Sequence, residues 1–248
     1  MNLWRLEWLR LIRTKRIVGL LGVYVFFGFL GPLSVRYMEQ ILENFGGGVQ
    51  IVVPEPMAAD GIAAYVGNAA QIGLLIAVGV AAAALAFDAK PQMGIFLRTR
   101  VASIREIITP RYVVTTVAVV GAFVLGSVAA LYESIVLMGS LPVADWALGT
   151  LFGSLYLAFA VAVVAAVAVR AKSVLVTVMI VLGVLLVLPI IGIAPAIGEW
   201  LPSYLVGAVD GMVRGVAVGE YIRAAAVTLA LTAVSLWMAV RWAQNREL

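Results

Sequence analysis

The sequence predicts an all-α, polytopic membrane protein whose six transmembrane helices form a single domain over all 248 residues. Six apolar stretches contain no Asp, Glu, Lys or Arg, and each is long enough to cross a hydrocarbon core, which takes about 20 helical residues. The chain is 64% hydrophobic and 12% charged, whereas soluble proteins contain about 25% charged residues. We place the spans at residues 17–35, 65–87, 112–131, 146–169, 174–194 and 224–240.

The basic residues fall almost entirely on one side of these spans. Of the 17 Lys and Arg residues, 14 lie in the terminal segments and the second and fourth loops; only Arg36, Arg214 and Arg223 lie opposite, among nine acidic residues. Lys and Arg concentrate in cytoplasmic loops, so we expect a multi-pass protein of the cell membrane with both termini cytoplasmic. An odd number of spans would remove this separation.

The N-terminal segment, residues 2–16, precedes the first span. Trp4, Trp8 and Leu11 recur at helical spacing, and Arg10 and Arg13 lie on the far side, as in an interfacial helix. A basic anchor with aromatic residues at the membrane interface is the simpler alternative.

Absent residue types exclude several chemistries. The chain has no Cys and no His, so thiolate, iron–sulfur, haem and histidine-based acid–base sites are not expected. The Lys172-Ser173 pair follows Ala171 and no glycine-rich loop, unlike the phosphate-binding loop of an ATPase. We therefore expect no catalytic residue, cofactor or metal site, and no enzyme activity, in this chain.

The charge distribution also limits the partners and the energy source. The net charge of +4 is divided among short cytoplasmic segments, which does not predict a nucleic-acid surface. Ion-coupled transporters usually keep ionisable residues within the membrane, and the six spans contain none. If the protein moves a substrate, we expect the energy to come from another subunit.

The second cytoplasmic loop, residues 88–111, combines apolar and basic side chains. Such a segment can lie on anionic lipid or dock into a groove on a partner. The apolar members are Ile95, Phe96, Val101, Ile104, Ile107 and Ile108, and the basic ones include Arg98, Arg100 and Arg105.

This loop resembles the corresponding loop of type-2 ATP-binding cassette (ABC) exporter permeases. In that family an acidic residue ends the second helix, and Gly, a Leu-containing turn, a basic stretch, a Glu-Ile-Ile-like run and a basic residue follow. The chain has Asp88, Gly94, Leu97, residues 98–105, Glu106-Ile107-Ile108 and Arg111 in that order. The basic N-terminal segment and a proline-rich interval before the sixth span extend the resemblance over the whole chain.

The resemblance implies one half of the transmembrane part of an exporter. A second permease subunit, identical or paralogous, would complete the substrate path, and a separate ABC ATPase would bind ATP and Mg. The residues implied for contact with that ATPase are Phe96, Arg98, Arg100, Ile104, Arg105 and Glu106. Apolar spans without charge suit an amphipathic, drug-like, lipid-like or natural-product substrate.

The interval between the fifth and sixth spans contains Pro189, Pro195 and the run Trp200-Leu201-Pro202-Ser203-Tyr204. Proline ends or kinks a helix, so we expect the fifth helix to end near Pro189 and short broken helices to follow. The resemblance implies an outer gate formed by Pro189, Trp200, Pro202 and Tyr204, with Trp200 buried. An ordinary external loop with interfacial Trp200 and Tyr204 is the alternative.

Polar and small residues inside the spans give weaker signals. Gly149 and Gly153 are spaced for close helix packing. Asn68 and Gln71 are expected near the outer end of the second span, where they hydrogen-bond neighbouring helices or line a path. They do not identify a substrate. A secondary transporter or channel and a non-transporting scaffold subunit remain alternatives.

The charge distribution makes a topology prediction. Single cysteines replacing Ser103 and Asp60 should react with a membrane-impermeant thiol reagent from opposite sides of the membrane. The native chain has no Cys, so no background reaction has to be removed. Labelling of both positions from the same side would contradict the six-span arrangement.

Overall fold

The structure, a computed structural model, describes residues 3–45, 55–86, 103–171 and 173–244. All regular secondary structure in these ranges is helical, and six helices there are long and apolar enough to cross a membrane. The protein is therefore an all-α polytopic membrane protein, as the sequence predicts. The spans are α2 (Arg16–Arg36), α4 to α5 (Ala58–Leu85), α7 (Arg105–Met138), α8 (Val143–Arg170), α9 (Val174–Ile191) and α12 (Val218–Gln244).

The long helices extend beyond the predicted apolar cores because helical hydrogen bonding does not stop where the hydrocarbon ends. The second span begins at Ala58, seven residues before the predicted start at Tyr65. Asp60 determines this start: its carboxylate accepts a hydrogen bond from the Met57 backbone N–H at 2.9 Å, and its own N–H donates to the Met57 carbonyl. This arrangement pairs donors that a helix N-terminus leaves free.

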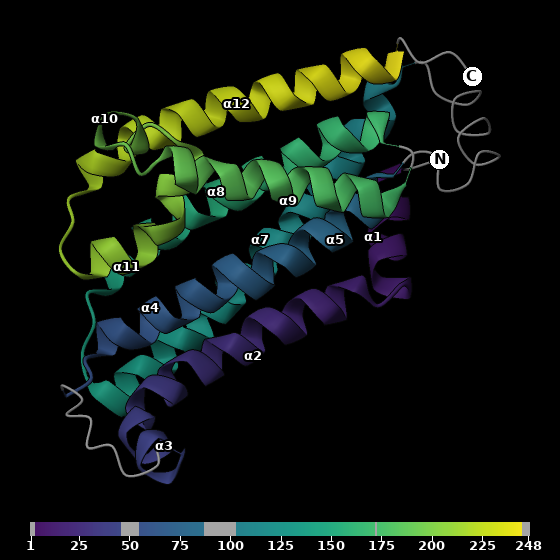
Figure 1. The fold of residues 1–248 in the computed structure, drawn as a ribbon. Coiled ribbons are helices and arrows are strands. Elements are labelled where there is room, and N and C mark those ends of the chain that lie inside the picture. Colours follow the sequence, from purple (N-terminus) through teal and green to yellow (C-terminus); the bar gives the residue numbers. More distant parts are fainter. Residues whose placement is uncertain (1–2, 46–54, 87–102, 172, 245–248) are drawn as a thin grey trace.

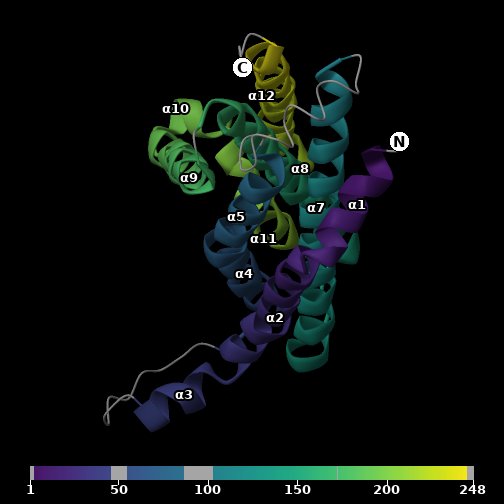
Figure 2. The same cartoon turned by 90° about the vertical axis from the view of Figure 1, so that its right-hand side faces the viewer.

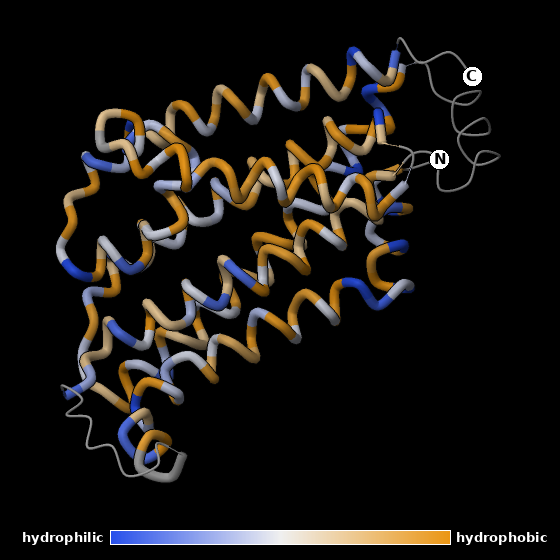
Figure 3. Tube along the Cα trace, viewed as in Figure 1, coloured by the Kyte–Doolittle hydropathy of each residue, from blue (hydrophilic) through white to orange (hydrophobic). Residues whose placement is uncertain are grey.

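Both ends of the described chain lie at the same end of the bundle (Figure 1). The short helix α1 (Leu3–Arg13) and the end of α12 are found there; α3 (Met38–Phe45), α10 (Pro195–Gly198) and α11 (Ala208–Val213) lie at the opposite end. Hydrophilic residues concentrate at the two ends and hydrophobic ones between them (Figure 3). An even number of spans places both ends of the chain at the same end of the bundle. We call that end of the bundle the terminal end and the opposite one the far end.

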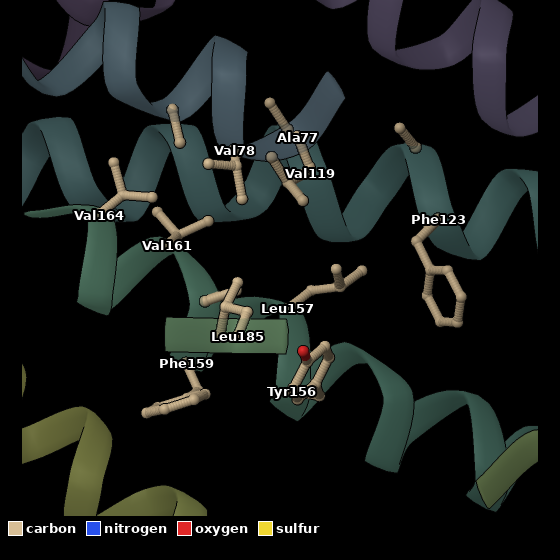
Figure 4. Packing of buried hydrophobic residues seen from close by; sticks show 14 of the residues in the cluster. Ala77, Val78, Val119, Phe123, Tyr156, Leu157, Phe159, Val161, Val164 and Leu185 are labelled. Carbon is tan, nitrogen blue, oxygen red and sulfur yellow. The ribbon is translucent and has the colours of Figure 1, made fainter. Parts of the chain in front are cut away.

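Helix α8 is the central element, since it packs against α5, α7, α9, α11 and α12. The view along the bundle shows α2 on one side, with α9 and α12 on the other (Figure 2). Valine and leucine side chains of α5, α7, α8 and α9 meet around Val78, Val119, Val161 and Leu185 (Figure 4). In contrast, α9 leaves Leu175, Met179 and Leu186 more than half exposed, as a lipid-facing helix would.

Helices α2 and α7 approach each other backbone to backbone. A Cβ added at Gly126 would collide with the Tyr24 carbonyl oxygen, and one at Gly28 with the Gly126 carbonyl oxygen. Tyr65 on α4 joins this contact by donating a hydrogen bond from its hydroxyl to the Phe123 carbonyl at 2.6 Å. Close approach of this kind is a main source of helix association in membranes, where hydrophobic burial gives no advantage between helices.

Gly149 and Gly153 of α8 also pack closely, as expected. A Cβ at Gly149 would lie 2.6 Å from the Val209 Cα, and one at Gly153 would lie 3.0 Å from the Phe123 ring. Gly149 therefore lets the backbone of α11 rest directly on α8.

Gly126→Ala should lower the free energy of unfolding by about 1–3 kcal/mol, the usual cost of overpacking, because the new methyl group meets main chain. Gly121→Ala, on the same helix, is the matched control, since a Cβ there meets nothing within 4 Å; we expect a change within about 0.5 kcal/mol. Equilibrium unfolding in detergent micelles measures both. Equal stability of the two variants would show that the α2–α7 contact is not tight.

Candidate functional site

Three of the six residues implied for ATPase contact lie within the described chain. Ile104 packs partly buried against the core, whereas Arg105 and Glu106, in the first turn of α7, are exposed at the terminal end. Phe96, Arg98 and Arg100 lie outside the described residues. The described part of the loop thus presents one arginine and one glutamate next to an apolar anchor.

A buried ion pair lies next to this segment. The Arg111 Nε of α7 donates a hydrogen bond to the Glu7 Oε1 of α1 at 3.0 Å, and each residue is only 6% exposed. The desolvation of both charges makes such a pair strongly dependent on its partner. Glu7 and Arg111 therefore join the N-terminal helix firmly to the third span.

Arg10 extends this ion pair to the second span. Its Nη1 lies 3.6 Å from Glu7 Oε2 and donates a hydrogen bond to the Ala84 carbonyl near the end of α5 at 3.5 Å. We call Glu7, Arg10 and Arg111 the terminal-end ion cluster. It connects α1 to the end of α5 and to the start of α7, the two helices that residues 87–102 join in the sequence.

Glu7 was not among the residues that the sequence singled out. The sequence does contain a signal for an ion pair here, because Glu7 is the one acidic residue among the first 16, five of which are basic. The helical spacing in α1 made Trp4, Trp8 and Leu11 the expected anchors, yet Trp4 is 46% and Trp8 is 37% exposed, whereas Leu11 is buried. Buried contact to α7 and exposed tryptophans on one helix suit a segment at a membrane interface.

The far end contains the broken element that the prolines predict. Helix α9 ends at Ile191, two residues after Pro189, and α10, a 3₁₀ turn η2 (Pro202–Gly207) and α11 follow before α12 begins at Val218. The second half of this broken element is buried. Leu205, Ala208 and Val209 are each fully enclosed, and η2 and α11 pack on α8. This half forms a cover over one end of the bundle.

The prediction that Trp200 is buried is wrong, since this residue is 48% exposed. The interior positions of the element are taken by Pro202 and Leu205, which are buried. The indole instead lies below the Arg223 guanidinium, 5.6 Å from the ring centroid. Tyr204 is half-buried and stacks beside Tyr221 at 5.1 Å between ring centroids.

Ion pairs hold this element to the spans. Arg214, after α11, donates hydrogen bonds to Asp60 of α4 and to Asp210, both at 2.7 Å. These two hydrogen bonds raise the pKa of Arg214 above its usual value. Arg223 of α12 pairs with Glu199 at 3.3 Å. All these side chains are substantially exposed, so each pair contributes at most about 1 kcal/mol.

A hollow of about 330 Å³ lies between the end of α9 and the broken element. Partial burial, followed by the carboxylates of Glu220 and Glu199, raises the pKa of Tyr204 above its usual value. The lining residues are Pro189, Gly192, Gly198, Glu199, Ser203 and Tyr204. Two of the four residues implied for an outer gate, Pro189 and Tyr204, thus face one hollow.

The two amides of the second span lie near the middle of its helix, which begins at Ala58, before the apolar stretch. Asn68 donates a hydrogen bond to the Ala64 carbonyl of its own helix at 2.9 Å. Gln71 is exposed on the surface of the chain. An exposed amide in the middle of a membrane-spanning helix favours contact with protein or water over contact with lipid.

The chain matches no family model, no curated protein and no solved structure.

Glu7→Gln should destabilise the protein by about 3 kcal/mol, because it removes the negative charge that lies next to the buried Arg111 guanidinium. Glu106→Gln, an exposed carboxylate on the same helix as Arg111, is the control and should change stability by less than about 0.5 kcal/mol. Denaturant titration in micelles compares the two. If Glu7→Gln is no worse than Glu106→Gln, the terminal-end ion cluster is not structural.

Proposed function

We propose that the chain is the transmembrane permease subunit of an ABC exporter, embedded in the cell membrane with both termini cytoplasmic. One half of a substrate path would come from this subunit and the other from a second copy or a paralogue. A separate ABC ATPase would supply the energy. Within the described residues, the basic helix α1, residues 103–111 and the end of α12 lie at the terminal end, which would suit a cytoplasmic ATPase bound there.

The observation that carries the proposal is the terminal-end ion cluster. Residues 87–102 connect α5 to α7, and α1 is bonded to both helices, through Arg10 to Ala84 and through Glu7 to Arg111. A force applied to this loop would act on two spans and the interfacial helix together. That mechanical connection is what a permease needs to convert closure of an ATPase into a movement of its helices.

The exposure of Gln71 supports the proposal that a second permease subunit is present. An amide that enters hydrocarbon without a hydrogen-bond partner costs roughly 2–7 kcal/mol, and Gln71 lies exposed midway along a span. Contact with another permease subunit or with a water-filled path would remove that cost. The second span is therefore the proposed lining of the path.

The far end supplies the proposed outer gate. Pro189, Pro202 and Tyr204 shape a cover over α8, and exposed ion pairs hold it to α4 and α12. These pairs are weak in water, so they would add little to the cost of moving the exposed part of the element, whereas its buried part, with Leu205 and Val209, is packed on α8. We propose an amphipathic, drug-like, lipid-like or natural-product substrate, since the apolar stretches of the six spans contain no charged residue.

Charge reversal in the loop tests the coupling. The double variant Arg100→Glu, Arg105→Glu should insert normally, because both residues lie outside the apolar stretches, yet it should lose most stimulation of a co-expressed partner ABC ATPase. A single exposed pair contributes only about 1 kcal/mol, so both residues are changed together. The measurement is ATPase activity of the purified complex in nanodiscs.

The control is Arg241→Glu, Arg246→Glu, which makes the same charge change in the C-terminal segment, also predicted to be cytoplasmic, and should leave stimulation intact. Equal loss in both double variants would indicate a general charge effect. Substrate transport by the purified permease without any ATPase would contradict the proposal and favour a secondary transporter.

A further inference from the structure

A π-helical turn, η1 (Ala69–Gly73), interrupts the second span at its centre. Such a turn carries one extra residue per turn and occurs often at functional sites. Its last residue, Gly73, packs against Tyr24 of α2: a Cβ there would lie 2.8 Å from the ring and 3.2 Å from the hydroxyl oxygen. Glycine at this position lets the phenol reach the π turn.

Tyr24 is buried deep in the bundle, with 1% of its surface exposed. Its ring packs edge-on to Phe123 at 6.0 Å between centroids. Among the described residues, its hydroxyl has no hydrogen-bond partner. An unpaired buried hydroxyl disfavours the folded state by roughly 5- to 150-fold, so a phenylalanine would serve better here unless the hydroxyl is used.

Tyr65 provides a comparison within the same core. It is also fully buried, and its hydroxyl donates directly to the Phe123 carbonyl at 2.6 Å. The bundle therefore pairs one buried phenol with main chain and, among the described residues, leaves the hydroxyl of Tyr24 without a partner. Tyr24 also lines a small cavity.

That cavity measures about 20 Å³. A water molecule needs at least about 10–15 Å³, whereas a drug-sized ligand needs several hundred, so the space suits one water. The space is partly open and mostly apolar, and its polar side chains are those of Tyr24 of α2 and Tyr156 of α8. Figure 4 draws Tyr156 with Leu157 and Phe123, which also line the cavity.

We propose that this cavity is a binding site for a single water molecule that bridges the hydroxyls of Tyr24 and Tyr156. Both tyrosines line the cavity, and each hydroxyl can donate or accept a hydrogen bond. A bridging water would satisfy Tyr24 without direct contact and would join α2 to α8 beside the π turn. This inference does not depend on the transport proposal.

A double-mutant cycle tests the bridge. The unfolding equilibrium constants of the native chain, Tyr24→Phe, Tyr156→Phe and the double variant are measured in micelles. A shared water predicts non-additive effects of at least about twofold. The control cycle pairs Tyr65→Phe with Tyr156→Phe; Tyr65 has its own main-chain acceptor, so that cycle should be additive.

A crystal structure that resolves ordered water provides the direct measurement. The expected result is density for one oxygen within hydrogen-bonding distance of both hydroxyls, lost in Tyr24→Phe. An additive Tyr24–Tyr156 cycle together with an empty cavity would overturn the proposal. Density for a detergent or lipid chain in the cavity would overturn it as well.

Discussion

The close contact between the backbones of α2 and α7 is the constraint on which the rest of the bundle depends. Gly28 and Gly126 remove the side chains that would hold the two helices apart. Tyr65 then reaches the Phe123 carbonyl, and Tyr24 reaches the π turn of the second span. Because lipid is as apolar as the helix surfaces, such steric fit and internal hydrogen bonding replace the hydrophobic force that packs a soluble core. The positions of α2, α4 and α7 thus follow from two missing side chains.

The two ends of the molecule are held by different kinds of electrostatic contact. At the terminal end, Glu7 and Arg111 are both buried, so neither can lose the other without a large penalty. At the far end, the ion pairs of Arg214 and Arg223 are exposed to solvent and exchange readily with water. The terminal end is thus held by a buried ion pair, whereas the far end is held mainly by buried apolar residues such as Leu205 and Val209.

Several features could be predicted from the sequence because they depend on local chemistry. The absence of charge over about 20 residues identifies each span, and Pro189 marks the end of the fifth helix within two residues. The prediction that Trp200 is buried was wrong, because aromatic character alone does not tell which residue of a broken segment points inward. Leu205 takes the interior position. The second span starts earlier than its apolar core because Asp60 caps it, so Asn68 and Gln71 lie near the middle of its helix.

The sequence by itself determined which segments cross the membrane and on which sides its basic residues gather, because transfer into hydrocarbon depends on each segment's own composition. Only the tertiary structure decided which distant residues meet. Glu7 pairs with Arg111, 104 residues away, and Tyr24 faces Gly73 and a cavity shared with Tyr156. Contacts of this kind are selected by shape and by the cost of an unpaired polar group, and both exist only after the helices have packed.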